Sequence, residues 1–168
     1  HDERAGLSAK AIAYYERAAA VAHRLAAVQE AVGFLTHAQT LLPLLPADDE
    51  QTRLALALQI ALGPLLLATK GYAAPEVEHA FHEAWQLCQR VGDTQQRFQV
   101  LWGLGKFYQV KPDLAKGTAV ARDLLALAQT EENPELLLEA YSIAGTHFFH
   151  TVALRDAKQY LDESLALY

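Results

Sequence analysis

Two pairs of histidines are the residues in this sequence whose spacing could support metal chemistry. His79 and His82 are three positions apart, as are His147 and His150, and this spacing places both members of a pair on one face of a helix. A zinc site needs three or four converging donors, and the His-Glu-x-x-His motif is absent, because Ala-Trp-Gln follows His82-Glu83. We therefore expect no metal and no cofactor, and histidines that lie on the surface or between helices.

Two other reactive residue types favour structural interpretations. Cys88 lies within a segment of helical apolar periodicity, which predicts a small buried side chain rather than a nucleophile. Gly105-Lys106 resembles the end of a phosphate-binding loop, but Val100 stands in the place of the first glycine and Phe107 in that of the Ser or Thr. No motif supports a hydrolytic triad. The sequence thus predicts that this chain is not an enzyme.

Composition narrows the remaining function classes. The chain has 168 residues, of which 52% are apolar, so it can bury a sizeable core. Its formal net charge of −6 argues against contact with a nucleic-acid backbone, which needs a positive surface. A single cysteine predicts a reducing, cytoplasmic location, and no uninterrupted apolar run reaches the roughly 18 residues of a membrane span. The complete absence of methionine predicts a fragment of a larger protein.

The elements that would position any site are helices. Apolar residues recur at spacings of three and four between stretches rich in Pro and Gly, which predicts an all-α protein rather than one with strands. We expect a single repeat domain over residues 1–168, with eight helices in four pairs at about 8–43, 50–92, 94–131 and 134–168. Within this scheme Pro75 suits a first helical position and Gly92 a C-terminal stop.

The four pairs also resemble one another. In the fourth pair, aromatic and small residues fall at the spacings of the tetratricopeptide pattern, at Tyr141, Ala144, Gly145, Phe148, Ala157 and Leu161. Small residues at the expected points of close helix approach are Ala19, Gly63, Gly105 and Gly145, with a period of about 42 residues. This period exceeds the roughly 34 residues of a standard repeat. The pattern predicts a right-handed α-α superhelix of about four tetratricopeptide-like pairs, each stabilised by stacking on its neighbours.

Three segments within this register carry a family resemblance. They cover residues 58–78, 88–94 and 100–104. The most specific parts are the Gly-Tyr-Ala-Ala-Pro turn at 71–75 and Leu-Trp-Gly-Leu at 101–104. The chain resembles the tetratricopeptide-repeat region of bacterial multidomain signalling proteins, in which this region follows an AAA-type ATPase domain, often fused to a class III adenylate or guanylate cyclase or a kinase. The resemblance implies a regulatory, partner-binding or autoinhibitory segment, with the catalytic residues upstream of it.

In a tetratricopeptide array, the first helix of each pair lines the concave face, which is the expected ligand groove. The repeat register predicts that this groove contains Glu16, Arg17, His23, Arg24, Trp102, Lys106, Gln109, Glu139, Ser142, Thr146, Phe149 and His150. Trp102 and Phe149 could anchor a peptide or helix among mixed charges. Alternatively, these two aromatic side chains pack against the next helix or a further repeat.

These patterns predict a non-catalytic module that binds a protein or peptide, or that docks on its own upstream ATPase or cyclase domain. The alternative is a small-molecule effector-sensing domain of a bacterial transcriptional or signalling regulator, which a dry pocket around Trp102 and Phe149 would favour. We expect neither a nucleic-acid nor a membrane partner. The final helix ends near Tyr168 without an obvious polar capping helix, so its exposed apolar face could mediate self-association.

Overall fold

The computed structural model describes residues 2–72, 74–111, 113–131, 133–150 and 154–167. Within these residues the chain forms eight α-helices and one short 3-10 turn, which confirms the predicted all-α class and the number of helices. The chain divides into two compact units, unit 1 with residues 1–93 and unit 2 with residues 94–168. Each unit contains two of the predicted helix pairs.

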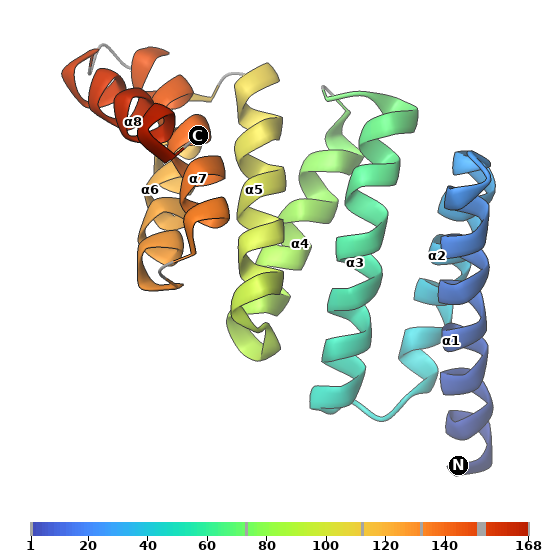
Figure 1. The fold of residues 1–168 in the computed structure, drawn as a ribbon. Coiled ribbons are helices and arrows are strands. Elements are labelled where there is room, and N and C mark those ends of the chain that lie inside the picture. Colours follow the sequence, from blue (N-terminus) through green and yellow to red (C-terminus); the bar gives the residue numbers. More distant parts are fainter. Residues whose placement is uncertain (1, 73, 112, 132, 151–153, 168) are drawn as a thin grey trace. The chain divides into compact units, whose positions relative to one another are not determined.

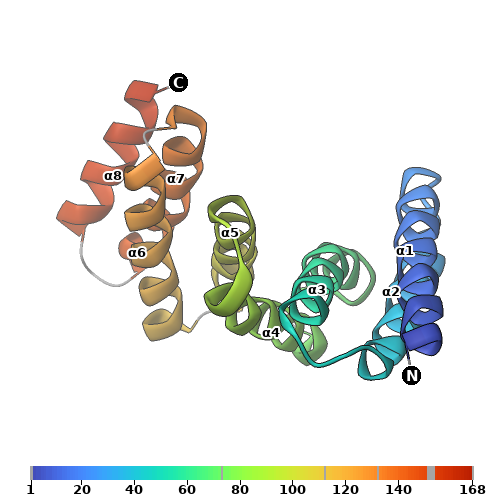
Figure 2. The ribbon, with the colours of Figure 1, turned by 90° about the horizontal axis from the view of Figure 1, so that it is seen from below.

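Unit 1 contains α1 (Asp2–Arg24), α2 (Val28–Leu41), the 3-10 turn η1 (Leu42–Leu44), α3 (Asp49–Lys70) and α4 (Pro75–Val91). Successive helices pack on one another, α1 on α2, α2 on α3 and α3 on α4 (Figure 1). Both views of the ribbon show α4 next to α3, on which it packs (Figure 1 and Figure 2). Helix α1 begins at Asp2, several residues before the expected start near residue 8.

Local sequence signals explain where α3 and α4 begin and end. The Asp48 carboxylate accepts a hydrogen bond from the Gln51 amide at 2.9 Å, which caps the start of α3. Gly71 ends the same helix with a φ of 80°, a conformation that favours glycine. Pro75 then occupies the first turn of α4, as predicted. The turn between the two helices is therefore fixed by residue types at both ends.

Helix α3 is long and apolar enough, by length and composition, to cross a membrane, and it is the one helix of this kind among the described residues. The core helix of a globular unit passes the same test. In unit 1, α3 packs on both α2 and α4, with Leu56, Leu58 and Leu62 buried. Its packing is therefore that of the central helix of the unit.

Unit 2 contains α5 (Thr94–Val110), α6 (Leu114–Glu131), α7 (Pro134–His150) and α8 (Leu154–Leu167). Helix α5 packs on both α6 and α7, α6 packs on α7, and α7 packs on α8. Phe107, Leu124 and Ile143 are completely buried and form the centre of this core. The sequence predicts a break between the two helices of the fourth pair near Thr151 and Val152, and these positions lie outside the described residues.

Two of the predicted small residues lie where helices approach closely. A Cβ on Gly63 of α3 would lie 2.8 Å from the Phe81 ring of α4, so glycine lets the two helices of this pair approach closely, as predicted. A Cβ on Gly105 of α5 would lie 2.8 Å from Ile143, which belongs to α7. The repeat pattern predicts that such a small residue lets the two helices of one pair approach closely. For Gly105 this prediction is wrong, because α5 also packs against α7, the first helix of the next pair.

Candidate functional site

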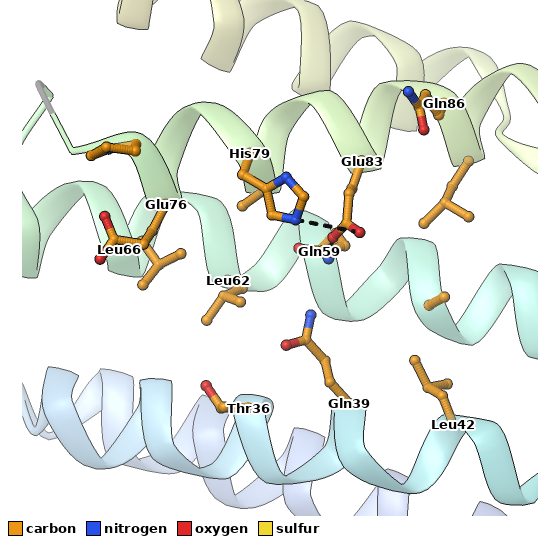
Figure 3. A pocket seen from close by; sticks show the side chains of 14 residues that line it. Thr36, Gln39, Leu42, Gln59, Leu62, Leu66, Glu76, His79, Glu83 and Gln86 are labelled. Atoms are coloured by element: carbon orange, nitrogen blue, oxygen red, sulfur yellow. Dashed lines mark hydrogen bonds and ion pairs between the residues drawn. The ribbon is translucent and has the colours of Figure 1, made fainter.

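A cleft runs between α2, α3 and α4 of unit 1 and has a volume of about 790 Å³ (Figure 3). This volume falls in the range of roughly 300–1,000 Å³ that is typical of ligand pockets. We call it the unit 1 cleft. Half of its lining residues are apolar, namely Leu42, Ala55, Leu62, Leu66, Pro75, Ala80 and Leu87, and half are polar, namely Thr36, Gln39, Gln59, Glu76, His79, Glu83 and Gln86. The cleft therefore combines apolar contact area with several groups that can orient a ligand.

Gln59, Glu83 and His79 form a polar centre in the wall of the cleft (Figure 3). The Gln59 side chain is only 8% exposed, and its amide nitrogen donates a hydrogen bond to the Glu83 carboxylate. The Gln59 carbonyl oxygen is buried without a hydrogen-bond partner. The other carboxylate oxygen of Glu83 lies 3.6 Å from Nε2 of His79, whose side chain is well exposed. The centre thus contains a negative charge and an unused acceptor.

An ion pair holds the rim of the cleft near the turn between α3 and α4. Lys70 Nζ lies 2.6 Å from the Oε1 oxygen of Glu76, and both side chains are about half exposed. The hydrogen bond from the Lys70 ammonium is the main reason why the pKa of the Glu76 carboxyl lies below its ordinary value. Glu76 therefore carries its charge at the entrance of the cleft down to a lower pH than a free glutamate would.

The four predicted groove residues of unit 1 lie on α1 and do not line the unit 1 cleft. Arg17 lines a second cavity of about 660 Å³ between α1 and α2, with Tyr14 and Leu25 among its walls. His23 and Arg24 are exposed in the last turn of α1, where positive side chains suit the helix C-terminus. Glu16 is partly buried, and this burial raises the pKa of its carboxyl.

Glu16→Gln is expected to stabilise the chain at neutral pH. A raised carboxyl pKa means that the fold favours the protonated form of Glu16. The stability that Glu16 contributes is therefore fully present below its ordinary pKa of about 4.3. It is lost as the pH rises through the higher pKa of the folded state. The variant should therefore exceed the wild type in free energy of unfolding at pH 7 and lose this advantage near pH 4. Urea unfolding at both pH values measures the difference, and an equal difference at the two pH values would contradict the expectation.

In unit 2, three of the predicted groove residues meet between α5 and α7. Nε1 of Trp102 donates a hydrogen bond of 2.8 Å to the Glu139 carboxylate. The Lys106 ammonium lies 5.4 Å from the centre of the Trp102 ring, a distance typical of a cation–π contact. Because Trp102 remains 37% exposed, this cluster presents an aromatic face flanked by both charges. Of the predicted groove residues of unit 2, these three are therefore the ones that the fold brings together.

The remaining predicted residues of unit 2 are more dispersed. Gln109 is partly buried, and the hydroxyl of Thr146 donates to the backbone carbonyl of Ser142 at 3.0 Å, along the same helix. Phe149 is 57% exposed, and the side chain of His150 lies outside the described part of the structure.

The histidines form separate contacts. His82 lies 3.9 Å from Glu78, and His79 pairs with Glu83 as described above. His147 is 3% exposed, and its Nε2 lies 3.0 Å from the Gly105 carbonyl oxygen, so this nitrogen carries the hydrogen. No group of three or more potential metal ligands comes together in the described residues. Cys88 is buried in α4, as its position in the sequence predicts.

Three glutamines that line the unit 1 cleft, Gln39, Gln59 and Gln86, were not predicted to lie in a binding site. One signal for the site is visible in the sequence, because Gln59 interrupts a long apolar run in the middle of α3. A buried amide in such a run needs hydrogen-bond partners from neighbouring helices or from a ligand. The identity of those neighbours depends on tertiary packing, which the run itself does not reveal.

The comparisons with known proteins add one relative. The chain is 28% identical, over 173 aligned positions, to the uncharacterized protein R02095 of Rhizobium meliloti (strain 1021). The match covers 100% of this chain and 16% of that protein, so the chain spans about a sixth of its relative's length. No family model matches the chain.

Proposed function

We propose that the chain is a non-catalytic helical module that binds a protein or peptide segment in the unit 1 cleft. The observation that carries this proposal is the cleft itself, where leucines from η1, α3 and α4 alternate with amide and carboxylate groups. Leucine walls provide contact area for an apolar side chain, and a few polar groups fix its orientation. A cleft between helices suits an amphipathic segment whose apolar residues recur on one face.

The larger setting that we propose is a bacterial cytoplasmic signalling protein with an ATPase domain and, in some cases, a nucleotide cyclase domain. The resemblance of residues 58–78 and 100–104 to such repeat regions supports this setting, as does the match to a small part of a much longer Rhizobium meliloti protein. In this setting the bound segment would belong either to a partner or to another domain of the same polypeptide. Occupation of the cleft would then regulate the catalytic domains.

Thr36→Trp is expected to block the cleft. Thr36 is exposed on α2 and points into the cleft from the wall opposite α4 (Figure 3), so a Trp there fills the space without disturbing the core. Peptides selected from a random display library on the wild-type chain should bind the variant at least about tenfold more weakly, which corresponds to roughly 1.4 kcal/mol. Fluorescence anisotropy of the labelled peptides measures this change.

Thr40→Trp is the matched control. Thr40 lies on the same helix, one turn later, and does not line the cleft. Its affinity for the selected peptides should equal that of the wild type. The proposal is wrong if the library yields no peptide specific for this chain, or if the two variants bind the selected peptides equally well.

A further inference from the structure

The unit 1 cleft holds a hydrogen-bond acceptor that the fold does not use. Gln59 is more than nine-tenths buried, and its Oε1 atom has no partner among the described residues. The reverse orientation of the amide would not remedy this, because the Glu83 carboxylate accepts hydrogen bonds and Gln59 must therefore turn its NH₂ group towards it. Since buried acceptors are nearly always paired in native proteins, the oxygen calls for a donor from outside unit 1.

Glu83 adds a negative charge beside this acceptor. Its side chain is 43% exposed, and one carboxylate oxygen faces Nε2 of His79 at 3.6 Å. The His79 side chain is 73% exposed, so this contact is weak and screened by solvent. Figure 3 shows the His79 ring beside Glu83 and Gln59 at the cleft wall. A ligand cation that competes for Glu83 would turn the His79 ring aside and open the way to the Gln59 oxygen.

The residues around this polar centre indicate what kind of cation fits it. Leu62 and Leu66 of α3 lie along the cleft on one side of Gln59, and Gln39 faces it from α2 (Figure 3). An alkyl stem can pack along the leucines while its charged head reaches the polar centre. The acceptors come from two different side chains, so a planar group with several N–H donors suits them better than a single ammonium.

We propose that the polar centre of the unit 1 cleft binds the guanidinium group of an arginine in the bound segment. Glu83 accepts a charge-assisted hydrogen bond from it, Gln59 Oε1 accepts a second, and the arginine stem packs on Leu62 and Leu66. This inference rests on the proposed function, because it names the residue type that the cleft selects in its partner.

The test uses a probe that carries only the relevant group. Butylguanidinium has the head and stem of an arginine side chain, and butylurea has nearly the same shape without the charge. Titration of the ¹⁵N-labelled chain with butylguanidinium should give saturable shifts of the backbone amides of Gln59, His79 and Glu83. Butylurea should bind at least about fivefold more weakly. Equal shifts with both probes would mean that a neutral donor, water included, is sufficient, and would overturn the proposal.

Three variants test whether butylguanidinium binds at Glu83. Glu83→Gln should weaken butylguanidinium binding about tenfold, as expected for the loss of a charge-assisted hydrogen bond. Glu78→Gln is the matched control, because Glu78 pairs with His82 on the same helix at the same spacing but does not line the cleft. It should leave binding unchanged. His79→Ala removes the competing group and should bind the probe as tightly as the wild type or more so. Equal weakening by Glu83→Gln and Glu78→Gln would also overturn the proposal.

The two proposals fail in different ways. If library peptides bind the cleft without an arginine and are insensitive to Glu83→Gln, arginine recognition is wrong and the peptide-binding function stands. If butylguanidinium binds at Glu83 but no peptide specific for the chain is selected, the guanidinium site is right and the proposed function fails.

Discussion

Gly117→Ala is expected to destabilise unit 2, although alanine is the better helix former. A Cβ at this position in α6 would lie 2.5 Å from Nδ1 and 2.6 Å from Cε1 of the His147 ring, and 3.3 Å from Cβ of Tyr108. The ring cannot easily move away, because His147 is buried and its Nε2 bonds to the Gly105 carbonyl. Overpacking of this kind costs about 1–3 kcal/mol, whereas the gain in helix propensity is about 1 kcal/mol. Because an approach of 2.5 Å is well inside van der Waals contact, we expect a cost in the upper part of this range, about 2–3 kcal/mol, and hence a net loss of about 1–2 kcal/mol in the free energy of unfolding.

Gly33→Ala provides the matched control with the opposite sign. Gly33 is exposed in the middle of α2, and a Cβ there meets nothing within 4 Å. The same substitution should therefore stabilise unit 1 by about 0.5–1 kcal/mol through backbone entropy and helix propensity.

The two tryptophans allow each unit to be followed separately by urea unfolding. Trp85 lies in α4 of unit 1 and Trp102 in α5 of unit 2, and the chain has no others. In a Trp85→Phe background the fluorescence reports unit 2, and in a Trp102→Phe background it reports unit 1. Stabilisation of unit 2 by Gly117→Ala would show that the close contact between α6 and α7 is not as the structure describes it.

The helices were predictable because their signals are local. Apolar spacing of three and four marks each helix, and residues such as Pro75 mark its start through their own backbone geometry. The start of α1 was placed near residue 8, where the apolar spacing begins, whereas the helix begins at Asp2. Helix boundaries depend on weak preferences, so they are the least certain part of a sequence-based assignment.

The contacts between helices were predictable only in part. The register correctly identified Gly63 and Gly105 as points of close approach, but the partner of Gly105 is Ile143 of α7, which depends on how three helices pack in unit 2. The register assigned Trp102, Lys106 and Glu139 to one groove, whereas their contacts with one another depend on the packing of α5 on α7. The unit 1 cleft was not anticipated, because α2 and α4 supply much of its wall, and the register assigns the ligand face to the first helix of each pair.

His147→Ala is expected to have the largest effect of these substitutions. The imidazole fills space between α5, α6 and α7, and it donates the 3.0 Å hydrogen bond to Gly105. Its removal loses both the packing of a buried ring and a buried hydrogen bond, so we expect the free energy of unfolding of unit 2 to fall by about 2–4 kcal/mol. His23→Ala, at an exposed position on α1, should change stability by no more than about 0.5 kcal/mol. Urea unfolding monitored by Trp102 fluorescence measures the stability change caused by His147→Ala. Urea unfolding monitored by circular dichroism of the whole chain measures the change caused by His23→Ala.

The double variant Gly117→Ala/His147→Ala then tests the physical cause of both effects. The methyl group that the first substitution adds is expected to clash chiefly with the His147 ring, so without this ring the clash is largely removed. In the His147→Ala background, Gly117→Ala should therefore stabilise unit 2 by up to about 1 kcal/mol, because the gain in helix propensity remains. The change of sign corresponds to a coupling energy of about 2–3 kcal/mol between the two positions, which is the upper range for residues in direct contact. If Gly117→Ala lowers the free energy of unfolding equally in both backgrounds, the added methyl group acts through Tyr108 or through the helix itself. The clash with the buried His147 ring would then not be the cause.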